Sequence, residues 1–339
     1  PLISGYGFSM TLPRQFRRLR IALIGYGDIA KRIAQKTSGH GPRWLAIGRS
    51  AKLPAAKIMD GKLGASFHNP ADRPRYLAWD LDHPKVAQRI ARVSQAMIVL
   101  SPPADQHPRN ANCDWRMRRL ACAIRKSGRR DAIVYISTTG VYGDQQGRIV
   151  TETSTACPGQ QRSLRRLDAE LSLRPIGAHV LRVPGIYGHD RLPIARLAAG
   201  QPALIATDDV YTNHIHADDL ARISWIALFR GRPGRITNAV DSSELKMADY
   251  FDAVADAAGL KRPPRISRDA MRSLGKSGGV HPMMLGFLSE SRRVRTSRLQ
   301  KELGVRLKFP TVAKTLEYFV AQGVPPIQAG LTKPAKRGE

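Results

Sequence analysis

The chain has 339 residues, and 42% of them are hydrophobic. This length allows one large core or two modest ones, because domains commonly hold about 100–200 residues. No uninterrupted apolar stretch approaches the roughly 20 residues that a membrane-spanning helix needs. The arginine-rich start, with Arg14, Arg17, Arg18 and Arg20, is not followed by the long apolar region and cleavage site of a secretory signal. These features exclude a membrane-spanning class and favour a folded protein.

The formal net charge of +28 indicates anionic partners. The cations are scattered, mostly at intervals expected for solvated helix faces, and no recognisable nucleic-acid module accompanies them. We therefore expect a small anionic substrate and regard nucleic acid as an unfavoured partner.

The three cysteines, Cys113, Cys122 and Cys157, are odd in number and lack metal-ligand spacing. They predict reduced thiols in a cytoplasmic protein and no metal site.

The first apolar run, Ile21-Ala22-Leu23-Ile24, stops at Gly25-Tyr26-Gly27-Asp28-Ile29-Ala30. The run predicts a buried parallel strand, and the apolar spacing after the glycines predicts a helix. In such a turn the first glycine permits a tight bend, the second allows backbone to approach a pyrophosphate, and the helix N-terminus donates N–H groups to the anion. We expect dinucleotide binding at Gly25, Gly27, Asp28 and Ile29. A glycine turn that only packs the helix is the alternative.

Further apolar runs predict strands near residues 44–48, 76–79, 96–100, 132–136 and 180–183. Residues 113–127 and 163–173 have helical patterns. Strands that alternate with helices predict an α/β fold with a doubly wound, Rossmann-type parallel sheet. The ligand is expected beyond the carboxyl ends of the strands, where Ser101-Pro102-Pro103 ends the fourth strand.

The alternation of strands and helices stops near Tyr187, where a smaller, discontinuous C-terminal cap is expected. Helical patterns at 247–259 and 312–321 are separated by proline-rich connections. We assign residues 18–186 and 213–240 to the nucleotide-binding domain. Residues 187–212 and 241–325 are assigned to the substrate cap, and residues 1–17 and 326–339 to flexible termini.

Several ordered motifs resemble the extended short-chain dehydrogenase/reductase superfamily, the NAD(P)-dependent epimerase/dehydratase-like proteins. Besides the glycine turn, they are Asp80-Leu81, Ser137-Thr138-Thr139-Gly140-Val141-Tyr142-Gly143, Leu181-Arg182-Val183-Pro184-Gly185-Ile186-Tyr187-Gly188 and Asn213-His214-Ile215-His216-Ala217-Asp218-Asp219-Leu220. The resemblance covers roughly residues 20–320 and implies a Rossmann-type fold. It also implies an oxidoreductase or sugar-nucleotide epimerase/dehydratase relative, with Asp80 and Leu81 near the adenine. It implies a possible homodimer through the helices at 113–127 and 163–173, although like charges crowd both.

The superfamily's Tyr-x-x-x-Lys pair is absent, because no such pattern occurs anywhere in the chain. An alignment on Pro158 and Glu170 puts Arg162 at the tyrosine position and Arg166 at the lysine position. Arginine cannot act as a base, since its pKa exceeds about 12. Arg166 could donate to a ribose hydroxyl, and Arg162 could clamp a carboxylate or phosphate.

Other polar groups in the motifs could have either a functional or a structural role. Thr138 occupies the superfamily's Ser/Thr position, where it could orient a substrate oxygen or only bond the backbone. Tyr142 is mainly structural in the resemblance, with a replacement acid as the alternative. His214 and His216 are expected to cap or pack near the start of the helix at Asp218.

The residues after the second strand indicate the cofactor. NAD-preferring sites usually place an acidic residue there, whereas this chain has Gly48-Arg49-Ser50, with Lys52 nearby. A cation would meet a 2′-phosphate, so Arg49 and Ser50 favour NADP(H) over NAD(H). The alternative is that Arg49 is one more surface arginine.

Three functions remain open from the sequence. The first is an NADP(H)-dependent oxidoreductase or epimerase/dehydratase relative with altered catalytic residues. The second is a non-catalytic NADP(H) sensor or scaffold, suggested by the missing proton couple. The third, less favoured, is an anion- or nucleic-acid-binding adaptor driven by the positive field.

Overall fold

The computed structural model describes residues 19–37, 42–50, 73–104, 110–128, 132–280 and 282–323. Contacts divide the chain into two units. Unit 1 comprises Pro1–Ser137, Leu164–Leu181 and Leu220–Ile236, and unit 2 comprises Thr138–Ser163, Arg182–Asp219 and Thr237–Glu339.

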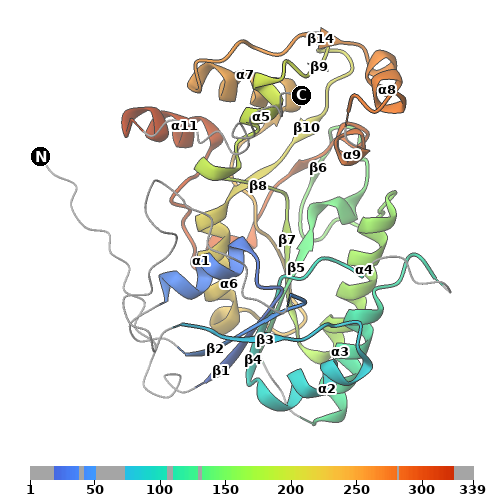
Figure 1. The fold of residues 1–339 in the computed structure, drawn as a ribbon, viewed down its shortest axis with the longest axis vertical. Coiled ribbons are helices and arrows are strands. Elements are labelled where there is room, and N and C mark those ends of the chain that lie inside the picture. The colour runs from blue at the N-terminus through green and yellow to red at the C-terminus, as the bar shows by residue number, and fades with distance from the viewer. Residues whose placement is uncertain are drawn as a thin grey trace, which may run out of the picture. The chain divides into compact units, whose positions relative to one another are not determined.

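A seven-stranded sheet forms the centre of the α/β fold (Figure 1). Its strand order is β12-β7-β5-β4-β1-β2-β3. β1 pairs in parallel with β2 and β4, β2 with β3, and β4 with β5. The strands are β1 (Arg20–Ile24), β2 (Arg43–Gly48), β3 (Arg75–Ala78), β4 (Ala96–Val99), β5 (Ala132–Thr138), β7 (His179–Val183) and β12 (Ile236–Asn238). The expected Rossmann-type α/β fold is confirmed, and the order of connection reverses between β1 and β4, where such sheets bind ligands.

Helices cover both faces of the sheet in unit 1, because alternate strand residues point to opposite faces. Ala22 and Ile24 of β1 belong to a buried cluster with α2 (Pro84–Val93), α3 (Trp115–Lys126) and α4 (Gln161–Leu173). The other face meets α1 (Asp28–Lys36) and α6 (Ala217–Arg230), and Trp44 of β2 packs on Trp225 of α6 with ring centroids 5.4 Å apart.

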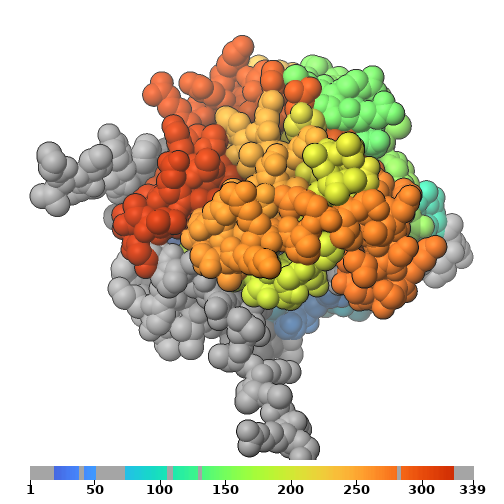
Figure 2. Space-filling model, turned by 90° about the horizontal axis from the view of Figure 1, so that it is seen from above, coloured from blue at the N-terminus to red at the C-terminus, as the bar shows by residue number. Residues whose placement is uncertain are grey.

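Unit 2 has its own core, built around α7 (Met247–Ala257). Phe251 and Val254 of α7 pack with α5 (Ile194–Ala198) and with Leu316 of α11 (Val312–Ala321). Figure 2 shows α7 between α11 and α8 (Arg268–Lys276) on one face of this unit. The remaining elements are the 3₁₀ helices η3 (Thr139–Tyr142), η4 (Arg174–Ile176) and η5 (His189–Arg191), helices α9 (Pro282–Leu288) and α10 (Arg298–Lys301), and short strands β6 (Ile149–Val150), β8 (Gly185–Tyr187), β9 (Ala203–Leu204), β10 (Tyr211–Thr212), β11 (His214–His216), β13 (Leu245–Lys246), β14 (Arg265–Ile266) and β15 (Arg293–Val294).

The strands expected from the sequence are present with small boundary shifts. β3 ends at Ala78 and β4 at Val99, each one residue earlier than expected. Helix α2 was not expected, although its start has a proline at the first helical position and a side-chain cap from His83. Most of the segment at 50–75, Lys52 and the expected flexible termini lie outside the described residues. Among the residues that are described, no helix has the length and apolar character to cross a membrane.

Candidate functional site

The glycine turn after β1 is shaped by close backbone contacts within unit 1. Gly25 has a φ of +93°, and a Cβ at this position would lie 2.5 Å from the Ser101 amide nitrogen. The Gly25 and Tyr26 amides both donate to the Ile47 carbonyl, at 2.9 and 3.1 Å. The turn is therefore fixed between the ends of β2 and β4, and only glycine fits at position 25.

The start of α1 leaves room for an anion. Gly27 is the N-cap residue and has no side chain that could cap an N–H group of the helix. No heavy atom lies within 4 Å of a Cβ placed at Gly27. Asp28 follows in the first turn, but Arg32 neutralises it through an ion pair at 3.0 Å. Ile29 is buried and anchors the helix to the sheet. The residues present therefore fit a pyrophosphate at the helix N-terminus.

Ser101 provides a second feature of the same unit that suits a ligand. Its amide donates to the Ile24 carbonyl at 2.9 Å, which holds it beside the glycine turn. Its Oγ is buried and has no hydrogen-bond partner in the described structure. Pro102 is exposed and Pro103 is buried, and both follow the end of β4 at Val99. A buried hydroxyl without a partner costs free energy unless a ligand or water satisfies it.

The end of β2 carries the candidate 2′-phosphate contact. Arg49 and Ser50 are exposed, and the Tyr76 hydroxyl donates to the Ser50 carbonyl at 3.0 Å. A Cβ at Gly48 would lie 2.6 Å from the Tyr76 Oη, so the tyrosine covers that glycine. The side chains of Arg49 and Ser50 are both exposed at the end of β2, where they could reach an anion.

Asp80 and Leu81 lie in the turn after β3. The Asp80 Oδ1 accepts from the Asp82 amide at 3.0 Å, and Leu81 is buried. Asp82 forms a two-pronged pair with buried Arg116, which holds the pKa of the Asp82 carboxyl below its usual value. The charges of Arg49 and Arg119 also lower the pKa of Asp82.

Arg166, at the lysine position, is a buried clamp within unit 1. Its Nη1 donates to the Ser101 carbonyl at 3.1 Å, the Ile136 carbonyl at 3.0 Å and the Tyr135 hydroxyl at 3.1 Å. The guanidinium also lies 5.6 Å from the centre of the Tyr135 ring, and burial raises the pKa of that tyrosine to about 12. Arg166 therefore ties together the carboxyl ends of β4 and β5.

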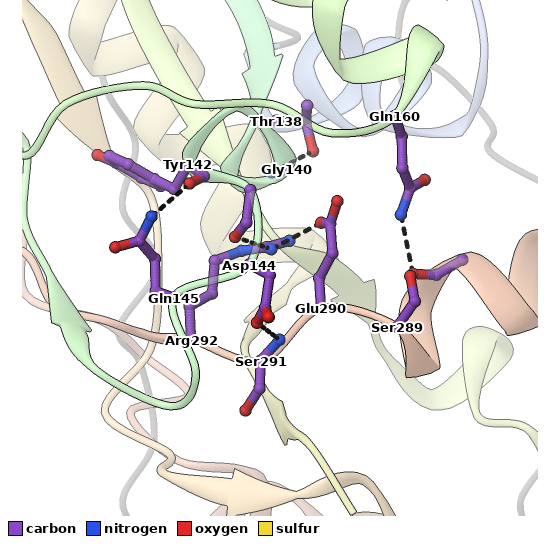
Figure 3. Close-up of polar contacts among 12 residues, drawn as sticks. Thr138, Gly140, Tyr142, Asp144, Gln145, Gln160, Ser289, Glu290, Ser291 and Arg292 are labelled. Carbon is purple, nitrogen blue, oxygen red and sulfur yellow. Dashed lines mark hydrogen bonds and ion pairs between the residues drawn. The ribbon is translucent and has the colours of Figure 1, made fainter. Parts of the chain in front are cut away.

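Unit 2 contains the other candidate residues, which surround the start of α4 (Figure 3). The Thr138 Oγ1 accepts from the Gly140 amide at 3.1 Å and so caps the η3 turn. A Cβ at Gly140 would lie 2.6 Å from the Ser163 Oγ, so this turn packs on the first turn of α4. Arg162 is exposed on that same turn. The structure thus places Thr138 next to the helix turn that carries Arg162.

Tyr142 has a structural position, as the resemblance implies. It is fully buried, its hydroxyl donates to the Asn238 Oδ1 at 2.8 Å, and Arg182 lies 4.7 Å from its ring centre. Burial raises the pKa of Tyr142. A replacement acid must reach its substrate, so this environment argues against that role.

A buried ion pair from the cap adjoins the same turn and was not found from the sequence. The Glu290 Oε2 and Arg292 Nη1 are 2.8 Å apart, with only 9% and 12% of their side chains exposed. Arg292 also donates to the Gly143 carbonyl at 2.7 Å. The side-chain Nε2 of Gln160 donates to the Gly286 carbonyl at 2.8 Å. Figure 3 shows Glu290 directed toward the segment with Thr138 and Gly140.

Two arginines are exceptions to the expectation that the cations mostly lie on solvated helix faces. Arg292 does not lie on a solvated helix face, because it follows α9 in an extended segment and pairs with Glu290. Arg116 is on a helix, but it is buried and paired with Asp82. Helical spacing places a residue on a face but does not reveal a carboxylate brought there from elsewhere in the chain.

Two buried ionisable groups elsewhere in unit 2 have strongly shifted pKa values. Burial lowers the pKa of His214 to about 3, and burial raises the pKa of Asp241 to about 7. His216 accepts from the Asp218 amide through its Nδ1 at 3.2 Å, which confirms the expected role at the start of α6. Among the described residues, no group of three or more His, Cys, Asp or Glu could hold a metal ion.

Solved structures share this fold. A functionally unknown conserved protein from Silicibacter pomeroyi is 25% identical, with a TM-score of 0.68 over 90% of this chain and 99% of that one. The UDP-glucuronic acid 4-epimerase from Bacillus cereus, solved with NAD, is 15% identical, with a TM-score of 0.64 over 90% and 99%. The Bordetella bronchiseptica enzyme WbmG, also solved with NAD, is 16% identical, with a TM-score of 0.66 over 93% and 98%.

The fold is therefore that of the NAD-dependent epimerase/dehydratase structures, which is the fold that the sequence motifs resemble. No family model matches the chain. No curated protein matches it in sequence either.

Proposed function

We propose that this protein binds NADP(H) through unit 1 and is an oxidoreductase or sugar-nucleotide epimerase/dehydratase relative with altered catalytic residues. The observation that carries the proposal is the open N-terminus of α1 beside the buried, unpartnered Ser101 Oγ. Solved structures of the same fold hold NAD, which supports a nicotinamide dinucleotide as the ligand. When bound, that group supplies hydride transfer.

Each candidate residue has a proposed task. Gly25 and Gly27 let the backbone approach the pyrophosphate, and Asp28 and Ile29 set the first turn of α1. Asp80 and Leu81 lie toward the adenine, and Ser101, Pro102 and Pro103 line the floor at the end of β4. Arg49, with Ser50, is proposed to select the 2′-phosphate.

Binding of both coenzymes tests this proposal directly. We expect NADPH to bind more tightly than NADH in a fluorescence titration, with the difference lost in Arg49→Ala. Arg43→Ala is the matched control, because Arg43 is also exposed but begins β2 instead of following its end. Failure to bind either coenzyme at millimolar concentration would refute the function, whereas tighter NADH binding would refute only the 2′-phosphate assignment.

A non-catalytic sensor or scaffold is the second candidate. It is favoured by the position of Arg166, whose Nη1 already serves three protein acceptors. It is also favoured by the lack of a Tyr-x-x-x-Lys pair in the sequence. Turnover of carbonyl or sugar-nucleotide compounds that is abolished by Thr138→Ala would favour the enzyme. Coenzyme binding without any turnover would favour the sensor.

A cytoplasmic location and a homodimer through α3 and α4 remain parts of the proposal. The three free cysteines support the first. For the second, Leu171 on α4 is 60% exposed and would supply apolar surface to such an interface.

A further inference from the structure

Exposed cations of unit 1 gather at one edge of its sheet. In a parallel sheet with helical crossovers, each helix runs back and ends where the next strand begins. Backbone bonds hold neighbouring strand starts together, since the Arg43 amide donates to the Leu19 carbonyl at 2.9 Å and the Gln95 amide to the Arg20 carbonyl at 2.8 Å. We call this side of unit 1 the amino edge and define it by six exposed residues, Arg20, Lys36, Arg43, Arg75, Arg92 and Arg125.

Acidic residues do not balance these cations locally. From the last two residues of α1, α2, α3, α4 and α6 to the first residue of the strand that follows each, the described residues include no Asp or Glu. Asp28, Asp82 and Asp114 instead lie at or just before the starts of α1, α2 and α3. The sheet therefore separates charge, and the described segments of the amino edge carry only positive charges.

Helix dipoles explain only part of this arrangement. A cation in the last turn of a helix is stabilised by the macrodipole, which accounts for Lys36 and Arg92. Arg20, Arg43 and Arg75 begin strands, where net dipoles are small. Arg20 and Arg43 are also partners in the register of β1 and β2, on strands about 4.8 Å apart, so their like charges repel. A bound polyanion would relieve that repulsion.

The composition of the amino edge selects the kind of polyanion. Five of its six defining residues are arginines, whose planar guanidinium groups match phosphate oxygens. A protein partner would require an apolar centre for its interface, whereas Leu171 is the only large apolar side chain exposed among the described residues of unit 1. Duplex nucleic acid has one negative charge per about 1.7 Å of its axis, a density that suits arginines on adjacent strands.

We propose that the amino edge binds the phosphate backbone of duplex nucleic acid without reading its sequence. Along the chain these cations are scattered, which is why nucleic acid was an unfavoured partner, but the fold brings them to one edge. The inference goes beyond the proposed function, because Gly27 and Ser101 lie at the opposite edge, where β1 and β4 end.

Fluorescence anisotropy with a labelled DNA duplex of about 20 base pairs tests the inference. If about six cations contact phosphates, affinity should fall about 10³-fold between about 50 and 200 mM salt. The double variant Arg20→Gln with Arg43→Gln should bind more weakly, and the slope of log affinity against log salt should become shallower by about 2. Its unfolding temperature should equal or exceed that of the parent, because a repulsion is removed.

Lys261→Gln with Lys314→Gln is the matched control, since it removes the same charge from two exposed residues of unit 2 and should keep the parent slope. Arg92→Gln with Arg125→Gln changes the amino edge at its helix ends and should repeat the effect of the first pair. The inference would be overturned by no duplex binding at about 50 mM salt, by equal changes in the edge and control pairs, or by tighter binding to phosphatidylserine vesicles than to the duplex. Displacement of the duplex by NADPH would also overturn it, because the two sites would then coincide.

Discussion

Replacement of Arg166 by methionine tests whether this residue is a structural clamp. The change removes the guanidinium and keeps an apolar stem of similar length. The Ser101 carbonyl, the Ile136 carbonyl and the Tyr135 hydroxyl would each lose a bond of 3.0–3.1 Å. A buried acceptor left without a donor costs about 1–3 kcal/mol, so three of them at the lower end lower the free energy of unfolding by about 3 kcal/mol.

Urea denaturation at neutral pH would measure this loss. Arg165→Met is the matched control, because the neighbouring Arg165 makes one bond, to the Ala111 carbonyl at 2.9 Å, and should cost only about 1 kcal/mol. Arg166→Lys should recover part of the loss, since an ammonium nitrogen also carries several donors but lies on a shorter side chain than Nη1. If Arg166→Met and Arg165→Met destabilise the protein equally, the clamp does not exist as described.

Three further predictions concern the glycine turn and the buried ionisable groups. Gly25→Ala should lower the free energy of unfolding by more than about 2 kcal/mol, because of its positive φ and the contact with Ser101. Gly27→Ala, which meets no atom, should unfold near the parent temperature but bind coenzyme less tightly; equal stability losses in the two variants would contradict this. Folded Asp241 keeps its proton up to about pH 7, whereas an unfolded aspartate loses it near pH 4, so its contribution to stability falls as pH rises through that window. Folded His214 takes up a proton only near pH 3, whereas the unfolded residue does so near pH 6.5, so its contribution rises with pH over that range. Urea denaturation from pH 4 to 6.5 should therefore show stability rising more steeply with pH in Asp241→Asn than in the parent and less steeply in His214→Gln; slopes unchanged from the parent would refute both assignments.

The fold was largely accessible from the sequence because its signals are local. Each buried strand of unit 1 is a short apolar run, and the glycine turn lies between a strand and a helix. These patterns depend on neighbours within a few residues, so no knowledge of distant contacts is needed. The parallel order then follows from the alternation of strands and helices.

The roles of the charged residues were much less accessible. From the sequence Arg166 could donate to a ribose hydroxyl, and in the structure it bonds three groups that lie 30 to 65 residues away in the chain. One signal could have indicated its burial: Ser163, Arg166, Ala169 and Leu173 recur at helical spacing, and all four are buried. Glu290 had no comparable signal, because its partner and its neighbours are brought together only by the folded cap.

The polar groups of unit 2 differ in what they could contribute to proton transfer. Arginine stays protonated, so Arg162 can donate and orient but cannot accept a proton from a substrate. Tyr142 is fully buried and bonded to Asn238, which argues against contact with a ligand. Thr138 already caps a turn but can still donate its hydroxyl hydrogen. None of Arg162, Tyr142 and Thr138 thus offers a ready proton acceptor, so loss of turnover in Thr138→Ala is the result that distinguishes an enzyme from a sensor.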